Sequence, residues 1–450
     1  MRRRLVKKTL NSEHGTLNLI LLTAACWEAM PRKEINLYSP RSPVPRASRR
    51  RESRPVLHRA RLVVPISRPA IEDGAVVVAE GTILEVGPFP LLRRQWPEAP
   101  ARDHDETALL PALVNGHAHL DLSALAGQVQ PKGSMAEWIR SLLATREQLD
   151  EEHLEKARVL ALDSLRTFGT GIVGDINSSG SFSRGQPNEV VISQTFVEVF
   201  GLHTQSLEVA IDQLPPAARK ILADNQESVS LAAHAAYTTS ATLLRELKEW
   251  GTARAKIISV HAAESEEEIN FLHCGQGPLR DLLEERGHEP DRWEVPGCGT
   301  ITYLDRLGFL DPFTLCVHAV HLSREEVQIL QRSGAGVCLC PRSNLFIGHG
   351  LPPVQELLQA QISCSIGTDS LASNANLNLF EEMAVLLEEC FISPEVVLTM
   401  ATLNGARNLG MASRYGSLDK GKRWLAIRIP AMDSEGIVAA GRQGALEWVS

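Results

Sequence analysis

Residues 108–119 read ALLPALVNGHAH, an apolar run that ends in two histidines separated by one residue. The run has the length and apolar content of a buried strand. Residues i and i+2 of a strand point to the same face, so His117 and His119 can converge on one ligand. Such a pair is weak evidence by itself, because chance and core packing produce many. Its meaning depends on the rest of the chain.

Seven further strand-like runs follow, with helical segments between them. They are GTGIVGDINSS (169–179), VVISQTFVEVFG (190–201), VSLAAHAAYTT (229–239), KIISVHAAES (256–265), FTLCVHAVHLS (313–323), AGVCLCPRSN (335–344) and ISCSIGTDS (362–370). The intervening residues, such as 135–149 and 151–169, repeat apolar positions at helical spacing. Eight βα units predict an α/β fold, a TIM (β/α)8 barrel, over residues 111–411. In this barrel the site lies at the C-terminal ends of the strands.

Metal-binding residue types fall at those strand ends. His261 is in the fifth run with Glu264 three residues later, His318 is in the sixth, and Asp369 is in the eighth. The alternative is a set of unrelated polar residues, which is disfavoured because packing alone would rarely bring them to the same end of different strands. Nitrogen and carboxylate donors suit zinc, and also iron(II) or manganese(II). We therefore expect one divalent transition metal, with zinc favoured.

The motifs GHAHLDLS (116–123), HAAES (261–265), VHAVHLS (317–323), CPRSN (340–344) and GTDSLASN (367–374) carry a resemblance. In order and spacing they resemble the cytosine deaminase and chlorohydrolase branch of the amidohydrolase superfamily. The resemblance implies four metal ligands, which are His117, His119, His261 and Asp369. It also implies that His318 orients the attacking water and shares proton transfer with Asp369, and that Glu264 protonates the substrate ring.

The expected reaction is a hydrolytic deamination. A metal lowers the pKa of its bound water to roughly 7, so hydroxide becomes available at neutral pH. By the resemblance, this hydroxide attacks C6 of an aminopurine and ammonia is released. The fourth run contains no lysine, so the carbamylated lysine that bridges two metals in dinuclear relatives is missing. A mononuclear site is implied.

Three residues are predicted to contact the substrate. AAHAAYTTS (232–240) resembles a segment of methylthioadenosine and adenosylhomocysteine deaminases in which the histidine contacts the purine, and this role would fall to His234. The alternative for His234 is a hydrogen-bonded residue at a strand end. Ser370 stands where those deaminases usually have glycine. Arg342 is predicted to bind a substrate carboxylate, and the alternative is a structural ion pair at the barrel rim.

The favoured function is deamination of an aminopurine nucleoside. Several motifs look more like those of aminodeoxyfutalosine deaminases, which act in menaquinone biosynthesis on an adenine nucleoside whose 5′ end carries a benzoate. One alternative is a methylthioadenosine, adenosylhomocysteine or adenosine deaminase. Another is a chlorohydrolase or aminohydrolase of a triazine or pyrimidine. The least favoured is a catalytically silent scaffold, because no ligand of the motif set is missing.

Short strand-like stretches also occupy both ends of the chain. Residues 58–66 and 70–89 alternate strands with turns, and residues 414–430 and 444–450 have the same character. They predict a small β-sandwich domain formed by residues 55–110 and 412–450. Residues 1–54 are basic and rich in proline and serine. We expect them to be a disordered extension, or to result from a start codon assigned too far upstream, rather than to be a signal peptide.

Composition limits the partners. The net charge of −8 argues against general nucleic-acid binding. No apolar run reaches the roughly 20 residues needed to span a bilayer. The eight cysteines form no CxxC pair, which favours a reducing, cytoplasmic compartment. The expected partner is a small heterocyclic amine or nucleoside, and a homodimer is left open.

Overall fold

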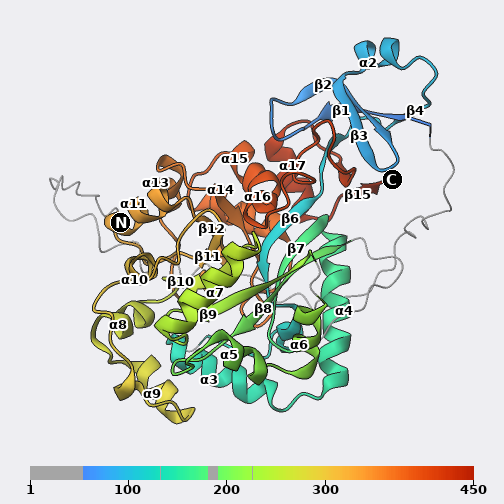
Figure 1. The fold of residues 1–450 in the computed structure, drawn as a ribbon. Coiled ribbons are helices and arrows are strands. Elements are labelled where there is room, and N and C mark those ends of the chain that lie inside the picture. The colour runs from blue at the N-terminus through green and yellow to red at the C-terminus, as the bar shows by residue number, and fades with distance from the viewer. Residues whose placement is uncertain (1–53, 132, 181–190, 225–226) are drawn as a thin grey trace, which may run out of the picture. The chain divides into compact units, whose positions relative to one another are not determined.

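The computed structural model describes residues 54–131, 133–180, 191–224 and 227–450. Apart from Arg54, the predicted N-terminal extension lies outside these residues. Eight strands form one parallel sheet in chain order (Figure 1). They are β6 (Leu113–Ala118), β7 (Thr170–Asn177), β8 (Ile192–Val199), β9 (Val229–Ala235), β10 (Ile258–Ala262), β11 (Thr314–His318), β12 (Gly336–Leu339) and β13 (Cys364–Ile366). All eight coincide with the predicted runs, so the TIM barrel is confirmed.

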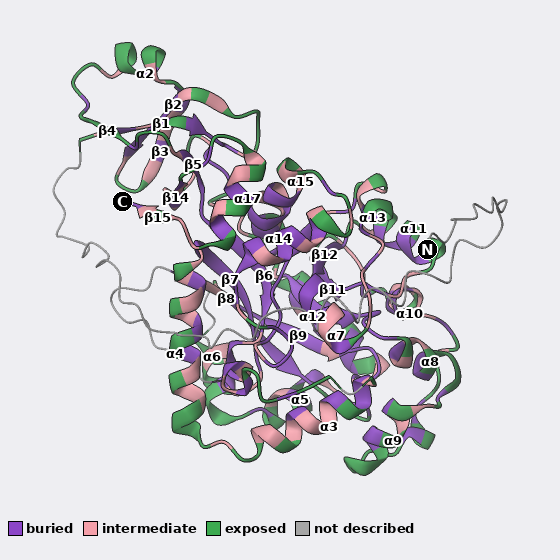
Figure 2. Ribbon diagram, turned by 180° about the vertical axis from the view of Figure 1, so that it is seen from behind, coloured by how far each residue is buried: buried purple, intermediate pink, exposed green. Residues whose placement is uncertain are grey.

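Backbone hydrogen bonds just after β13 hold the last strand of the sheet against the first, β6, and nearly close the barrel. The backbone N–H groups of Thr368 and Asp369 both donate to the His117 carbonyl oxygen at 3.1 Å. Gly367 permits this approach, because a Cβ there would lie 2.7 Å from the same oxygen. Strands β6 and β7 are buried along their whole length (Figure 2). Burial on both faces explains why these strands are nearly continuous apolar runs.

Helices and short helical turns occupy the connections between barrel strands. They are the 3₁₀ turn η1 (Leu120–Leu125), α3 (Met135–Arg146), α4 (Glu151–Thr167), α5 (Leu207–Gln213), α6 (Pro216–Ala223), α7 (Ala241–Ala253), α8 (Glu266–Cys274), α9 (Pro278–Glu285), η2 (Pro290–Arg292), α10 (Thr300–Arg306), α11 (Arg324–Ser333), α12 (Pro341–Ile347) and α13 (Val354–Gln359). Within the described residues no helix is long and apolar enough to cross a membrane.

Local sequence sets where these helices begin and end. Before α11, the Ser323 side chain accepts a hydrogen bond from the Glu326 N–H. In return, the Glu326 carboxylate accepts a hydrogen bond from the Ser323 N–H. This reciprocal cap satisfies two donors that the first turn leaves open. Gly334, with a φ of 72°, ends the helix in the left-handed region. Helix α11 therefore carries a start signal and an end signal in its own sequence.

The chain after the barrel is mostly helical before it returns to the small sheet. Its helices are α14 (Leu379–Glu388), α15 (Pro394–Thr399), the π-helical turn η3 (Met400–Asn404) and α16 (Gly405–Asn408). A further helix, α17 (Ser434–Arg442), lies between two strands of the small sheet, β14 (Ala426–Ile429) and β15 (Glu447–Val449). The remaining helix, α2 (Phe89–Gln95), follows the first hairpin. A hydrogen bond from the Ala112 N–H to the Leu425 carbonyl, at 2.9 Å, joins the start of the barrel to the C-terminal segment.

Both ends of the chain form the small β-domain, as predicted. Its strands are β1 (Val56–Val63), β2 (Ile71–Ala79), β3 (Thr82–Pro88), β4 (Ala101–Asp103), β5 (Ala108–Pro111), β14 (Ala426–Ile429) and β15 (Glu447–Val449). They form one mixed sheet in the order β15-β14-β5-β1-β2-β3 (Figure 1), and not the two packed sheets of the predicted sandwich. The reason is β1, which pairs with β2 along one edge and with β4 and β5 along the other.

Two buried histidines lie inside this small sheet. The rings of His58 on β1 and His104 after β4 are stacked, with centroids 5.3 Å apart. His58 Nδ1 lies 3.1 Å from His104 Nε2. Burial, followed by the charges of His104 and Arg102, lowers the pKa of His58 from 6.5 to about 3. His58 is therefore held as the neutral imidazole.

This pair predicts a loss of stability in acid. Unfolded His58 takes up a proton below a pH of about 6.5, whereas folded His58 takes one up only near pH 3, so the free energy of unfolding falls as the pH drops between these values. The limiting slope for one group is about 1.4 kcal/mol per pH unit. His58→Gln should reduce the loss between about pH 7 and about pH 5 in urea unfolding. His153→Gln, at an exposed histidine, is the matched control; an unchanged slope in His58→Gln contradicts the prediction.

Candidate active site

The structure brings five of the predicted residues together at the C-terminal ends of the barrel strands. His117 and His119 lie at the end of β6, His261 on β10, His318 at the end of β11, and Asp369 after β13. His119 Nε2 is 3.2 Å from His261 Nε2 and 3.7 Å from Asp369 Oδ1. His117 Nε2 is 3.6 Å from Asp369 Oδ1. Residues up to 252 positions apart thus share one cluster.

The donor atoms fit a divalent cation. His117, His261 and His318 offer nitrogen atoms that lie within 4.8 Å of one another, and so do the donors of His117, His119 and Asp369. His117 is fully buried, yet neither ring nitrogen has a hydrogen-bond partner among the described residues. An unsatisfied buried polar group is costly. A metal at the centre of the cluster would satisfy it.

Hydrogen bonds fix which ring nitrogen faces the cluster. His261 Nδ1 donates to the His234 carbonyl at 2.7 Å, which leaves the Nε2 lone pair directed at the cluster. His318 Nδ1 lies 2.9 Å from the Asn344 side-chain oxygen, an acceptor, so its Nε2 also carries a lone pair. Burial, then the charge of His117, lowers the pKa of His119 to about 4. Neutral imidazoles held by such outer partners are what a metal site requires.

The Asp369 carboxylate is oriented by two serines that the sequence analysis did not single out. Its Oδ2 atom accepts from Ser343 Oγ at 2.5 Å and from Ser373 Oγ at 3.0 Å. The other oxygen, Oδ1, is the one that faces His117 and His119. Both serines belong to quoted motifs, CPRSN and GTDSLASN. Their position in these motifs could have pointed to both serines, but a motif alone does not show which atom each serine binds.

Residues in or beside the cluster, among them Ala263, His318 and Asp369, have left-handed backbone conformations. The φ angles are 55° at Ala263, 75° at His318 and 55° at Asp369. Non-glycine residues adopt this region at a cost of about 1–3 kcal/mol, and such residues gather at functional sites. Backbone hydrogen bonds impose the conformation here, including the bond from the Asp369 N–H to His117.

Glu264 lies on the rim of the cluster and not inside it. Its Oε1 atom is 3.6 Å from His318 Nε2, and its side chain is buried. Burial, then the charges of Asp369 and Glu268, raises the pKa of Glu264 well above its usual value. Glu268 Oε2 accepts the Glu264 N–H at 2.8 Å and so holds the loop. Glu264 is placed as a proton donor, and Glu268 is a positioning residue that the sequence analysis missed.

A further donor group does not require a second metal. Glu198, His234 and His261 have donor atoms within 4.8 Å of one another. The His261 nitrogen near Glu198 is Nδ1, at 3.7 Å, and its proton is already bound by the His234 carbonyl. Strand β9 carries no lysine. The geometry and the sequence both favour one metal.

A cavity of about 410 Å³ opens from the cluster, and its lining includes His234, Ser370, Glu264 and His318. His234 is held by Thr238, with Nδ1 2.8 Å from Oγ1, and stacks on Phe200 with centroids 4.6 Å apart. The lining also has an apolar part, which comes mainly from α3 and α9. Its members are Met135, Trp138, Ile139, Leu142, Leu143, Leu279, Leu282 and Leu283.

Arg342 is not among the residues that line this cavity, and its predicted contact with a substrate carboxylate stays a prediction. Its guanidinium donates to Asn376 Oδ1 at 2.8 Å and lies 3.9 Å from Glu382 Oε1. Glu382 is fully buried and needs a nearby cation and hydrogen bonds. These contacts match the alternative of a structural ion pair. The guanidinium groups that line the cavity are those of Arg146 and Arg286.

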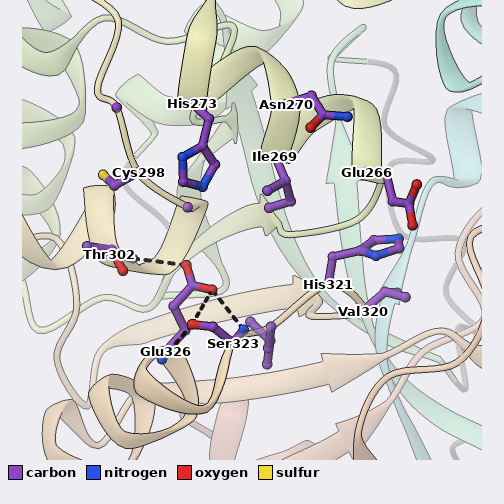
Figure 3. A pocket seen from close by; sticks show the side chains of 13 residues that line it. Glu266, Ile269, Asn270, His273, Cys298, Thr302, Val320, His321, Ser323 and Glu326 are labelled. Atoms are coloured by element: carbon purple, nitrogen blue, oxygen red, sulfur yellow. Dashed lines mark hydrogen bonds between the residues drawn. The ribbon is translucent and has the colours of Figure 1, made fainter.

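A second cavity, of about 660 Å³, lies between α8, α10 and α11 (Figure 3). It contains His321, which follows His318 by three residues, but none of the predicted site residues. Glu326 is occupied there, because its carboxylate accepts the Ile301, Thr302 and Ser323 N–H groups. This cavity is separate from the metal cluster.

A barrel with a histidine and carboxylate cluster at its C-terminal end defines the class as a metal-dependent hydrolase. The profile of the Amidohydrolase family matches residues 108–435, and the chain belongs to this family. It is therefore an enzyme that hydrolyses carbon–nitrogen bonds other than peptide bonds.

Three known proteins illustrate the similarity. A 5-methylthioadenosine/S-adenosylhomocysteine deaminase of Moorella thermoacetica is 29% identical over 374 residues, which cover 80% of this chain and 82% of the relative. An aminodeoxyfutalosine deaminase of Deinococcus radiodurans is 29% identical over 376 residues, which cover 79% of this chain and 85% of the relative. The crystal structure of Helicobacter pylori aminofutalosine deaminase with methylthio-coformycin has a TM-score of 0.75 at 24% identity and covers 86% of this chain and 95% of that chain. This last likeness concerns the fold.

Proposed function

We propose that the protein is a mononuclear metal-dependent deaminase that converts a 6-aminopurine nucleoside into its 6-oxo product. The observation that carries the proposal is the juxtaposition of the metal cluster with a buried Glu264 that lines the same cavity and lies 3.6 Å from His318 Nε2. Relatives named as adenine-nucleoside deaminases support it. The metal ligands in this proposal are His117, His119, His261 and Asp369, and zinc is the favoured metal.

The chain's own groups divide the reaction between them. When bound, the metal supplies a Lewis acid that lets a water molecule lose a proton near neutral pH. His318 Nε2, fixed by Asn344, accepts a hydrogen bond from the water that attacks C6. Glu264 donates its proton to ring N1 as the C6–O bond forms. The proton that the attacking water loses passes to the His318–Asp369 pair and from there to the leaving nitrogen. The C6–N bond then breaks, the C6 hydroxyl returns its proton to Glu264, and ammonia departs.

The cavity also suggests the finer substrate class. Beyond the apolar wall, Arg146 and Arg286 line the cavity, and each has its nearest carboxylate oxygen beyond hydrogen-bond range. The distances are 3.9 Å from Arg146 Nη2 to Asp121 and 3.6 Å from Arg286 Nη1 to Glu147. Such guanidinium groups can bind a carboxylate. A 6-aminodeoxyfutalosine-like nucleoside carries an aromatic group and a carboxylate at its far end. The apolar residues of the lining can pack on the aromatic group, and Arg146 and Arg286 can bind the carboxylate.

We expect 6-aminodeoxyfutalosine to be preferred over adenosine and methylthioadenosine, because its carboxylate reaches these arginines. Hydrogen bonds to a charged group contribute roughly 1.5–3 kcal/mol, or about 10- to 150-fold in kcat/KM. Arg286→Met and Arg146→Met should each reduce the preference and leave adenosine turnover nearly unchanged. The measurement is ammonia release from the three nucleosides.

Arg140→Met is the matched control, because Arg140 lies on the same helix as Arg146 but pairs with Glu285 outside the cavity. Equal turnover of all three nucleosides would contradict the carboxylate argument and indicate a general adenosine deaminase. Release of ammonia or chloride from a triazine or pyrimidine, with no purine nucleoside turned over, would reject the proposed function.

A further inference from the structure

One wall of the cavity carries two carboxyl groups to which the proposed chemistry assigns no role. Asp121 lies in η1, just after β6, and Glu198 lies on β8. Both are buried, with exposed fractions of 6% and 3%. Both line the cavity together with Ser178, which follows β7. Three neighbouring strands thus place these polar groups on one wall, opposite the leucines of α3 and α9.

Ser178 binds one oxygen of each carboxyl group. Its N–H donates to Asp121 Oδ2 at 3.3 Å, and its hydroxyl donates to Glu198 Oε2 at 2.7 Å. The other two oxygens, Asp121 Oδ1 and Glu198 Oε1, are buried and accept no hydrogen bond from the described residues. Glu198 Oε1 is 3.7 Å from His261 Nδ1, but that proton goes to the His234 carbonyl. The wall therefore presents two acceptors that lack donors.

Buried acceptors without donors are rare and costly, so a molecule in the cavity is expected to supply the donors. We propose that Asp121 and Glu198 bind the two vicinal hydroxyl groups of the substrate's ribose. The proposal rests on the proposed nucleoside deaminase function and adds its sugar specificity. One hydroxyl donates to Asp121 Oδ1 and the other to Glu198 Oε1.

Position and charge favour hydroxyl groups over other donors. The His261 ring lies between Glu198 and the metal cluster, so a group bound at Glu198 is remote from the carbon that reacts. A substituent of the purine fits there, and the leaving amine does not. A ligand ammonium is disfavoured because Arg146 lies 3.9 Å from Asp121 Oδ2 and lines the same cavity. Neutral hydroxyls meet no such repulsion.

This placement also orients the rest of the nucleoside. With the purine at the metal cluster and the sugar at the polar wall, the 5′ substituent faces the remaining surfaces of the cavity. These are the leucines of α3 and α9 and the guanidinium groups of Arg146 and Arg286. Each part of the substrate then meets a wall of matching polarity, which is the usual property of a specific site.

The test compares adenosine with 2′-deoxyadenosine and 3′-deoxyadenosine on the metal-loaded wild-type enzyme. We expect removal of the hydroxyl at Asp121 to lower kcat/KM by roughly 10- to 150-fold, as for a hydrogen bond to a charged group. Burial raises the pKa of Glu198 to about 8, so removal of the hydroxyl at Glu198 should lower kcat/KM by about 2- to 12-fold, as for a neutral hydrogen bond. Asp121→Asn and Glu198→Gln should each bring one of the two ratios closer to one. Glu249→Gln, at an exposed residue of α7 outside the cavity, is the matched control and should leave both ratios unchanged.

The outcomes separate this inference from the proposed function. Equal turnover of all three nucleosides overturns the ribose assignment and leaves the deaminase function standing. A preference for adenosine that survives in both Asp121→Asn and Glu198→Gln also overturns it, because other groups must then bind the hydroxyls. Turnover of no nucleoside by the wild type rejects both. Because the comparison of sugars is made on the wild type, it does not depend on whether a variant folds.

Discussion

Alanine at His117 or at Asp369 should leave the protein without tightly bound metal and without measurable turnover. His117 is fully buried with two unsatisfied ring nitrogens, and Asp369 Oδ1 lies within 3.7 Å of two histidine nitrogens. Removing either donor leaves the proposed metal one ligand short. Elemental analysis of the wild type should give about one divalent metal per chain, as a single closed donor set implies.

The control for this experiment is His273→Ala, because His273 is exposed and lies outside the cluster. This variant should keep both metal and activity. Retention of metal by His117→Ala would show that the proposed ligand set is wrong. Two tightly bound metals per wild-type chain would show that Glu198, His234 and His261 form a second site after all.

Glu264→Gln should keep the metal and lose about 10²- to 10⁴-fold in kcat, the usual contribution of a general acid or base. The amide has the shape of the acid but cannot deliver its proton. Glu264 is buried beside His318 and lines the cavity, and its loop is held separately by Glu268, so we expect the fold and the metal to be unaffected. The measurements are metal content, the melting temperature and single-turnover rates.

Glu266→Gln provides the comparison, since Glu266 is exposed and lies only two residues farther along the chain. It should retain full activity. Loss of metal in Glu264→Gln would make Glu264 a ligand. Full activity in Glu264→Gln would mean that another group protonates the ring.

The inner metal cluster was accessible from the sequence because parallel strands end on the same side of a barrel. Once eight apolar runs were recognised, polar residues at their ends had to lie close together, whatever the loops did. His117, His119, His261, His318 and Asp369 all follow this rule, and the structure places them together. Ser343 and Ser373, which hold Asp369, lie in the same motifs, whereas Glu268, which holds the Glu264 loop, lies three residues beyond the HAAES motif. Their partners depend on side-chain directions that a motif does not encode.

Two features could be known only from the tertiary structure. They are the pairing of Arg146 with Arg286 in the cavity lining and the single sheet of the small domain. Arg146 and Arg286 lie 140 residues apart on α3 and α9 and become neighbours of one cavity only through helix packing, so no local pattern could join them. Arg342, which follows a strand end, turns away because buried Glu382 holds it. The ends of the chain were expected to meet, but only the pairing of β1 along both of its edges makes them one sheet. Periodicity determines which residues share a face or a strand end, whereas contacts between distant elements depend on packing that the sequence pattern does not specify.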